Sequence, residues 1–327
     1  MKMKLIPYFL SFWYPLLPTT KMYPFQPSKA DILSVPLVIY YKNKTDQYIA
    51  HSDICPHQGA SLSSGQITKK DCFLQCPYHG FQFDEGKFCH IPDPSNSRIQ
   101  PFQSRIQLPT FDVQKEKDFL FIRNASHHHN DTVYYPPEEN NPSFRGVSGT
   151  IKISTNYLSI CENLLDMLHI SYVHTFGSRQ TPLPTSMNFT WLGPFHGRST
   201  FLYRPNENTI SRKVGQVEQV KVENEFILPT NTITRVFAGK TIKTVFTRTI
   251  PISETESILY WKIYRNFWMF PWADIFIRRL MEQTVQEDIG ILQKVYPKKR
   301  DGPLRTRYDR TILEFRSLSK KYGLYKN

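Results

Sequence analysis

Short stretches in which apolar and polar residues alternate dominate the first part of the chain. Residues 35–41 and 47–50 are rich in β-branched and aromatic side chains, and the polar segment 42–46 separates them. They therefore predict two antiparallel strands joined by a turn. The same alternation recurs over residues 81–84, 111–113 and 119–122. We expect residues 10–125 to form a domain of small antiparallel strands.

The second part of the chain mixes strand-like and helical patterns. Strand-like runs cover residues 147–157, 187–191, 199–203, 219–228, 232–237, 242–250 and 258–263. The turn residues 238–240 predict a hairpin between two of these strands. Helical spacing predicts a short helical segment over 160–174 and longer helices over 272–294 and 306–321. Residues 126–327 therefore predict an α+β domain, with a long C-terminal helix across an antiparallel sheet.

The length and composition of the chain agree with two globular domains. Its 327 residues accommodate two domains of ordinary size, and the polar, proline-rich segment 124–146 has the composition of a linker. Lys and Arg number 41 against 28 Asp and Glu, which gives a net charge of +13. These positive charges are spread along the chain without a nucleic-acid-binding motif, so we expect no nucleic-acid partner.

The first 18 residues combine basic residues with an apolar run, as secretory signal peptides do. Pro7 and Pro15 interrupt the run, no small-residue cleavage site follows, and the run is too short to span a bilayer. We interpret this segment as part of the fold, with a peripheral membrane contact as an additional role. A cleaved targeting peptide is the alternative.

Two cysteine–histidine boxes carry the clearest chemistry. The first is Cys55-Pro56-His57, and after eighteen residues comes Cys76-Pro77-Tyr78-His79. Structural zinc would accept these four ligands, although zinc boxes usually pair two cysteines in the first box. A [2Fe–2S] cluster in which two cysteines hold one iron and two histidines hold the other needs this set. Because histidine replaces cysteine on one iron, the potential of such a cluster is higher than that of an all-cysteine cluster.

The two boxes, together with Gly59 and Gly80, resemble the motif of Rieske proteins. Respiratory Rieske proteins carry an extra cysteine in each box, whereas Tyr78 stands at that position of the second box here. The respiratory class is therefore disfavoured. The resemblance to Rieske oxygenases extends along nearly the whole chain, through residues 13–15, 76–80, 90–92 and 264–267.

A second group of candidate ligands lies in the helical segment. Glu162, Asp166 and His169 follow the i, i+4, i+7 spacing that predicts a single polar helix face. His174 would point elsewhere on an ideal helix, so the helix must end or distort if both histidines bind one ion. A solvent face with one buried histidine is the alternative. Two histidines and one carboxylate with open positions form the facial triad of non-haem Fe(II) oxygenases.

The spacing of these residues resembles the mononuclear-iron motif of Rieske oxygenases. The resemblance implies that His169 and His174 bind Fe(II). It also implies that Asp166 couples this iron to the cluster of a neighbouring subunit in a head-to-tail homotrimer. The third ligand is expected on a later helix, where Asp288 is the matching residue and Glu287 competes with it.

The resemblance as a whole implies a β-rich Rieske domain over residues 10–125 and a helix-grip catalytic domain over residues 126–327. Residues 162–166 and 264–267 look most like the pheophorbide a oxygenase group, which includes chlorophyllide oxygenase and chloroplast translocon-associated Rieske proteins. We therefore expect a terminal oxygenase component that uses O₂ to hydroxylate, demethylate or ring-open a cyclic or aromatic organic substrate.

The electrons for such a reaction are expected from a separate reductase or ferredoxin, because no nicotinamide or flavin fingerprint is present. The positive surface suits an acidic donor. The other cysteines, Cys72, Cys89 and Cys161, form no even framework, so we expect a reducing compartment, either cytoplasm or plastid. The alternative function is a Rieske electron carrier or redox-sensing interaction protein, which would need only the first domain.

Overall fold

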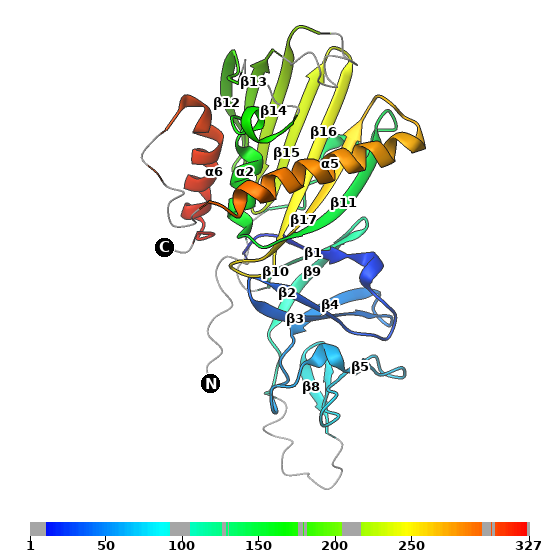
Figure 1. The fold of residues 1–327 in the computed structure, drawn as a ribbon. Helices are drawn as coiled ribbons and strands as arrows, with labels where there is room; N and C mark the ends of the chain where they lie inside the picture. Colours follow the sequence, from blue (N-terminus) through cyan, green and yellow to red (C-terminus); the bar gives the residue numbers. More distant parts are fainter. Residues whose placement is uncertain are drawn as a thin grey trace. The chain divides into compact units, whose positions relative to one another are not determined.

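The computed structural model describes residues 11–91, 105–125, 129, 131–175, 179, 182–204, 217–295, 302 and 305–325. The chain divides into two compact units, Met1–Val133 and Tyr134–Asn327 (Figure 1). Residues 1–10, which form much of the segment compared with a signal peptide, lie outside the described residues. None of the helices within the described ranges is long and apolar enough to cross a membrane.

The first unit contains two antiparallel sheets in its described part. One has six strands in the order β1-β10-β9-β4-β3-β2 and the other has four in the order β5-β6-β7-β8. The strands are β1 Tyr14–Pro18, β2 Ser28–Ile32, β3 Val35–Lys42, β4 Gln47–Ser52, β5 Gln66–Ile67, β6 Leu74–Gln75, β7 Gln82–Asp84, β8 Lys87–His90, β9 Thr110–Glu116 and β10 Phe119–Asn124; the 3-10 helices η2 Thr19–Lys21 and η3 Leu62–Ser64 connect some of them. The two strand pairs predicted from alternation, β3 with β4 and β9 with β10, are confirmed.

The second unit is built on one antiparallel sheet with the strand order β11-β17-β16-β15-β14-β13-β12. Its strands are β11 Arg145–Ile153, β12 Ser186–Gly193, β13 His196–Tyr203, β14 Val220–Ile227, β15 Asn231–Ala238, β16 Thr241–Pro251 and β17 Ser257–Arg265. Its described helices are η5 Pro137–Asn140, α2 Tyr157–Leu165, α3 Ile170–Val173, α5 Pro271–Leu292, η7 Arg307–Asp309 and α6 Arg310–Lys321. The predicted hairpin between β15 and β16 is confirmed.

The long helix α5 crosses the sheet of the second unit (Figure 1). Pro271 opens the helix at a position where the missing N–H costs nothing. Ala273, Ile277, Met281 and Val285 follow at intervals of four residues and are all buried. The last three belong to a core cluster with Trp261 and other residues of β11 and β17. One apolar stripe therefore fixes the helix to the sheet, which confirms the predicted α+β architecture.

The prediction of a single helical segment over residues 160–174 is wrong. Helix α2 ends at Leu165, Asp166 is extended with φ −79° and ψ 117°, and α3 begins at Ile170. The Asp166 carboxylate accepts the N–H of Leu168 at 2.8 Å, and such a local bond competes with helical hydrogen bonding. The break reorients the residues on either side of it.

The spacing predicted that Glu162 shares one helix face with Asp166 and His169. Because of the break, it does not. Its carboxylate accepts two hydrogen bonds of 2.8 Å from Arg316 of α6. Glu162 therefore holds α2 against α6 and takes no part in the candidate iron site.

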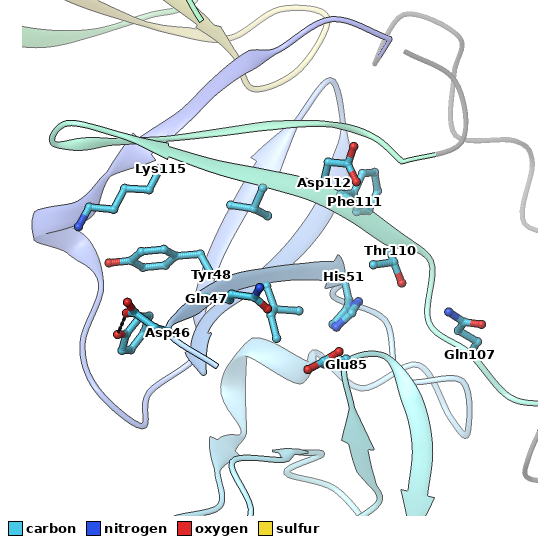
Figure 2. Close-up of a pocket in the computed structure, with 13 residues that line it drawn as sticks. Asp46, Gln47, Tyr48, His51, Glu85, Gln107, Thr110, Phe111, Asp112 and Lys115 are labelled. Atoms are coloured by element: carbon cyan, nitrogen blue, oxygen red, sulfur yellow. Dashed lines mark hydrogen bonds between the residues drawn. The ribbon is translucent and has the colours of Figure 1, made fainter. Parts of the chain in front are cut away.

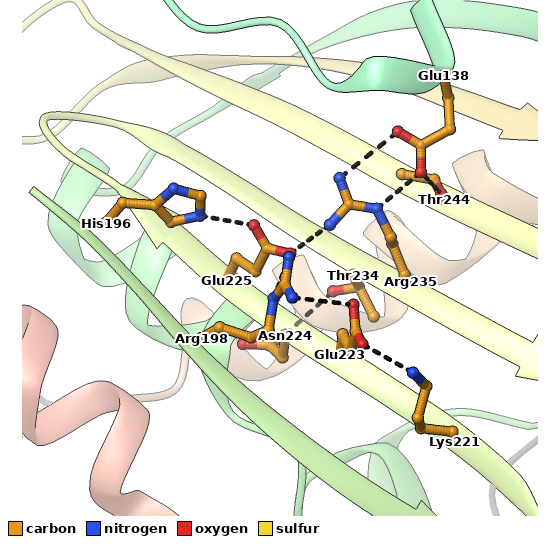
Figure 3. Close-up of polar contacts among 10 residues, drawn as sticks. All are labelled: Glu138, His196, Arg198, Lys221, Glu223, Asn224, Glu225, Thr234, Arg235 and Thr244. Atoms are coloured by element: carbon orange, nitrogen blue, oxygen red, sulfur yellow. Dashed lines mark hydrogen bonds and ion pairs between the residues drawn. The ribbon is translucent and has the colours of Figure 1, made fainter. Parts of the chain in front are cut away.

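Buried charges also tie the segment before β11 to the sheet (Figure 3). Arg235 of β15 lies between two carboxylates, donating to Glu138 of η5 at 2.7 Å and pairing with Glu225 of β14. Glu225 is fully buried and also contacts His196 Nε2 at 2.6 Å and Arg198 Nε at 2.9 Å. Burial raises the pKa of Glu225, but the hydrogen bond with His196 and the guanidinium groups of Arg235 and Arg198 outweigh it and hold the pKa below its usual value.

Gly149 in β11 gives a test of sheet packing. It lies opposite Trp261 of β17, and a Cβ at this position would come within 2.4 Å of the indole. Gly149→Ala should therefore lower the free energy of unfolding by about 1–3 kcal/mol, measured by chemical denaturation. Gly146→Ala on the same strand is the control, because its Cβ would meet the flexible Lys262 side chain first. Equal losses in the two variants would contradict this packing.

Candidate functional site

The two cysteine–histidine boxes form loops with the same backbone hydrogen bonds. In each loop the cysteine N–H donates to the carbonyl five residues later, and the N–H of the glycine donates back to the cysteine carbonyl, over 2.8–3.1 Å. Gly59 has φ +76° and Gly80 has φ +71°, a conformation that other residues rarely adopt. The glycines thus close two matching loops around Cys55 and Cys76.

The four side chains of these loops separate into an inner and an outer pair. Cys55 and Cys76 are both 2% exposed and belong to the core cluster of the first unit. Burial, with the neighbouring Cys76 thiol, raises the pKa of Cys55 to about 11. His57 and His79 lie nearer the surface with their Nδ1 atoms 3.1 Å apart. Two adjacent thiols inside and two adjacent imidazoles outside fit a cluster with one iron on each pair.

Two further residues support the first loop, and the sequence analysis did not identify their roles. Asp53 is 3% exposed and accepts hydrogen bonds from the Ser61 hydroxyl at 2.6 Å and the Ser63 N–H at 2.6 Å. The ring of Phe81 stacks on His57 with 4.6 Å between centroids. Asp53 holds the start of the loop and Phe81 fixes the imidazole plane.

The second candidate site brings together His169, His174 and Asp288. The two Nε2 atoms are 3.2 Å apart, and Asp288 Oδ1 lies 3.3 Å from the first and 3.4 Å from the second. These separations are short enough for all three atoms to bind one metal ion at bonds of about 2.1 Å. The three donors would therefore suit one metal ion.

The break between α2 and α3 brings both histidines to this site. His169 immediately precedes α3 and His174 immediately follows it, so a single turn of helix separates them. Asp288 comes from α5 and is buried against the same point. The helix was expected to end or distort between His169 and His174, and α3 does end at Val173, where His174 becomes extended with φ −92° and ψ 142°.

The site favours a positive charge. Burial lowers the pKa of His169, but the carboxylates of Asp166 and Asp288 outweigh this and raise it to about 9. Asp288 Oδ1 is buried and has no hydrogen-bond partner among the described residues. A metal ion would supply positive charge beside both carboxylates and a partner for this oxygen.

The neighbouring acids Glu287 and Asp288 both reach the site, although only one was expected to face it. Asp288 contributes to the triangle, whereas Glu287 Oε2 lies 2.9 Å from Nδ1 of His174. Gln283 donates to the other Glu287 oxygen at 3.1 Å. Asp166 Oδ2 is 3.7 Å from Nδ1 of His169, beside that ring and outside the triangle. Each imidazole thus has a carboxylate near the nitrogen that faces away from the triangle.

An open groove of about 610 Å³ in the first unit is separate from these sites (Figure 2). Strands β4 and β9 pair only at Ala50–Phe111 and His51–Thr110 and then diverge, which leaves the groove between them. His51 lines it, and burial lowers the pKa of this histidine to about 4. None of the predicted ligands lines the groove, so we assign it no role in the chemistry.

Comparison with known proteins agrees with this division. Residues 12–112 match the Rieske [2Fe-2S] domain, and residues 153–323 match the vanillate O-demethylase oxygenase C-terminal domain. Methylxanthine N1-demethylase NdmA of Pseudomonas putida is 28% identical over 211 residues, which are 62% of this chain and 57% of that protein. The oxygenase component of dicamba O-demethylase of Stenotrophomonas maltophilia is 31% identical over 151 residues, 46% of this chain and 43% of that protein.

A third relative comes from the group named in the sequence analysis. Chloroplastic pheophorbide a oxygenase of Oryza sativa subsp. japonica is 30% identical over 204 residues, 58% of this chain and 38% of that protein. The chain spans about half the length, or less, of these curated relatives. The structure of NdmA of Pseudomonas putida CBB5 with caffeine has a TM-score of 0.77 at 21% identity, covering 97% of this chain and 92% of that one. At this identity the likeness shows a shared fold.

Glu287 gives a test of the second site. Glu287→Ala should weaken Fe(II) binding about 10- to 100-fold in anaerobic titration, because the His174 ring loses the group that orients it. Glu287→Gln keeps an acceptor oxygen and should restore most of the affinity. Glu282→Ala, at an exposed position on the same helix, is the control. Equal affinities for Glu287→Ala and the control would contradict the role of Glu287.

Proposed function

This chain belongs to the Rieske non-haem iron oxygenases that share the vanillate O-demethylase catalytic domain, and from that membership we propose that it is a terminal oxygenase component. It would use O₂ and externally supplied electrons to oxidise a small cyclic organic substrate. The activity, substrate and partners below are parts of this proposal.

The convergence of His169, His174 and Asp288 is the observation that carries the proposal. These residues would hold ferrous iron, which supplies the capacity to activate O₂ for attack on the substrate. Cys55, Cys76 and the paired histidines of the first unit would hold the [2Fe–2S] cluster, which supplies electrons one at a time. An electron carrier needs only the first of these sites, so the second one argues against that alternative.

The residues around the triangle position the ligands. Glu287 accepts from Nδ1 of His174, which selects the tautomer whose Nε2 is free to face the ion. Asp166 fixes the turn into His169 through the Leu168 N–H and places its second oxygen beside the His169 ring. We assign Asp166 the task of orienting His169 and of connecting it to the cluster of a neighbouring subunit in a homotrimer.

Demethylation is the reaction that the relatives favour. Both the N1-demethylase and the O-demethylase relatives are named for removing a methyl group from nitrogen or oxygen on a ring-containing compound. Insertion of one oxygen atom into a C–H bond of that methyl group gives an unstable hydroxymethyl product, which releases formaldehyde. The reaction consumes O₂, two electrons and two protons, and the second oxygen atom leaves as water. Ring opening, and hydroxylation that leaves the methyl group in place, are alternative reactions of the same O₂-activating iron.

The pheophorbide a oxygenase relative supports a second substrate class. Its 30% identity covers 58% of this chain, so a tetrapyrrole is the competing substrate. In both cases a reductase or ferredoxin must deliver the electrons. All five cysteines are free, which suits the reducing compartment, cytoplasm or plastid, in which we place the protein.

Replacing His169 tests the proposed function. His169→Ala should reduce formaldehyde release from methylxanthines or methoxybenzoates about a thousandfold or more, because the triangle loses a donor. The visible spectrum of the cluster should not change. His90→Ala, at an exposed position in the first unit, is the control and should keep both properties. Loss of the cluster in His169→Ala would contradict the model of two independent sites. If the unaltered protein oxidises pheophorbide a and not the methylated compounds, the second substrate class is the correct one.

Asp166→Asn tests the connection between the sites. The variant should keep both metals, because Asn can still accept the Leu168 N–H. Reoxidation of the reduced cluster in a single turnover with O₂ and substrate should slow about tenfold or more, since the carboxylate beside His169 is lost. Unchanged reoxidation with unchanged iron content would remove Asp166 from the electron path.

A further inference from the structure

The start of α5 and the loop before it expose an unusual amount of apolar surface. Five large side chains fall within eight residues, with exposed fractions of 39% for Met269, 60% for Phe270, 66% for Trp272, 60% for Ile275 and 48% for Phe276. We call these five residues the apolar patch. Single exposed apolar side chains are common, but a contiguous group usually marks an interaction surface.

The helix period explains why the apolar patch faces outward. Trp272, Ile275 and Phe276 stand at i, i+3 and i+4 on one side of α5. Ala273 and Ile277 on the opposite side are 0% and 2% exposed, against the sheet. The first two turns of α5 are therefore apolar on both sides. The buried side holds the helix to its own unit, which leaves the exposed side available for another contact.

The charges around the apolar patch are positive. Asp274 is the only acidic residue between Arg265 and Met281 in the sequence. Its charge is paired with Arg145 at 2.7 Å and Arg265 at 2.6 Å. Two exposed arginines, Arg278 and Arg279, follow the patch directly after Ile277.

A groove beside the apolar patch provides room for a polar group. It has a volume of about 540 Å³ and is lined by Ile275 of the patch, by Asp274, Arg278, Arg279 and Glu282 of α5, and by part of β11. The Asp274 carboxylate is already paired with two arginines. An anionic group in this groove would lie within reach of two guanidinium groups while the aromatic side chains remain alongside.

We propose that the apolar patch inserts into the surface of an anionic lipid bilayer, with Arg278 and Arg279 at the level of the lipid phosphates. Aromatic rings beside arginines suit the boundary between headgroups and acyl chains. The net charge of +13 adds attraction to an anionic surface. A symmetric contact of two patches would instead bring their own arginines together, so charge complementarity favours the lipid over that contact. This contact places the enzyme where an apolar substrate would collect.

Vesicle flotation with the full-length holoprotein tests the proposal. The protein should float with phosphatidylcholine vesicles that contain one-third phosphatidylglycerol, and much less with pure phosphatidylcholine. Trp272→Ser combined with Phe276→Ser should reduce binding about tenfold or more, because the buried apolar area is lost. Arg279→Gln should also weaken binding and reduce its dependence on salt.

Two matched variants serve as controls. Tyr23→Ser removes a 60% exposed aromatic side chain from the first unit, and Lys240→Gln removes an exposed charge from the β15–β16 turn. Both should bind vesicles as the unaltered protein does. Thermal unfolding and the cluster spectrum will show that each variant is folded. Absence of vesicle binding, equal binding by Trp272→Ser/Phe276→Ser, or dissociation of a wild-type oligomer by that double variant would each overturn the proposal.

Discussion

Three donor atoms from two distant segments must be held within 3.4 Å of one another, and the catalytic unit is arranged around this requirement. Without a cation the arrangement is unfavourable, since Asp288 Oδ1 is buried without a hydrogen-bond partner among the described residues. The packing energy of α5 on the sheet offsets that cost. The apolar stripe that includes Val285 and Leu292 places Asp288 beside the histidines, so core packing and ligand geometry depend on the same helix.

Ion pairs hold the elements that surround this helix. Glu162 joins α2 to α6 through Arg316, and Arg235 joins η5 to the sheet through Glu138. Asp274 joins α5 to the ends of β11 and β17. The pairs of Glu162 and Arg235 are buried. Buried pairs contribute little net stability once desolvation is counted, but losing one partner costs about 3–5 kcal/mol. Their effect here is positional, because each one fixes a segment whose displacement would spread the three donors.

The sequence predicted the features that depend on local spacing. The cysteine–histidine boxes were recognisable because each loop supplies its own two donors and its own glycine. Alternation of apolar and polar residues predicted strands in both units, and the helical spacing of apolar residues predicted α5. Asp288 required a resemblance to a known family, since no local pattern separates it from Glu287.

The remaining features depend on competition between local and tertiary contacts. The spacing of Glu162, Asp166 and His169 predicted one helix face, but the bond from Leu168 to the Asp166 side chain ends the helix first. Glu287 reaches Nδ1 of His174 because its longer side chain extends around the helix, which spacing alone cannot show. The apolar patch was not foreseen either, because a helix that is apolar on two sides reads as a buried one.

The most direct test of the account is electron paramagnetic resonance of the anaerobic, iron-reconstituted protein after addition of nitric oxide. Nitric oxide occupies an open position on ferrous iron and gives a high-spin signal distinct from that of a reduced Rieske cluster. The account predicts both signals in one preparation, because His169, His174 and Asp288 would supply only three of the ligands of the iron. A reduced cluster signal with no nitrosyl signal, despite iron in the preparation, would contradict an oxygen-activating site and leave an electron carrier.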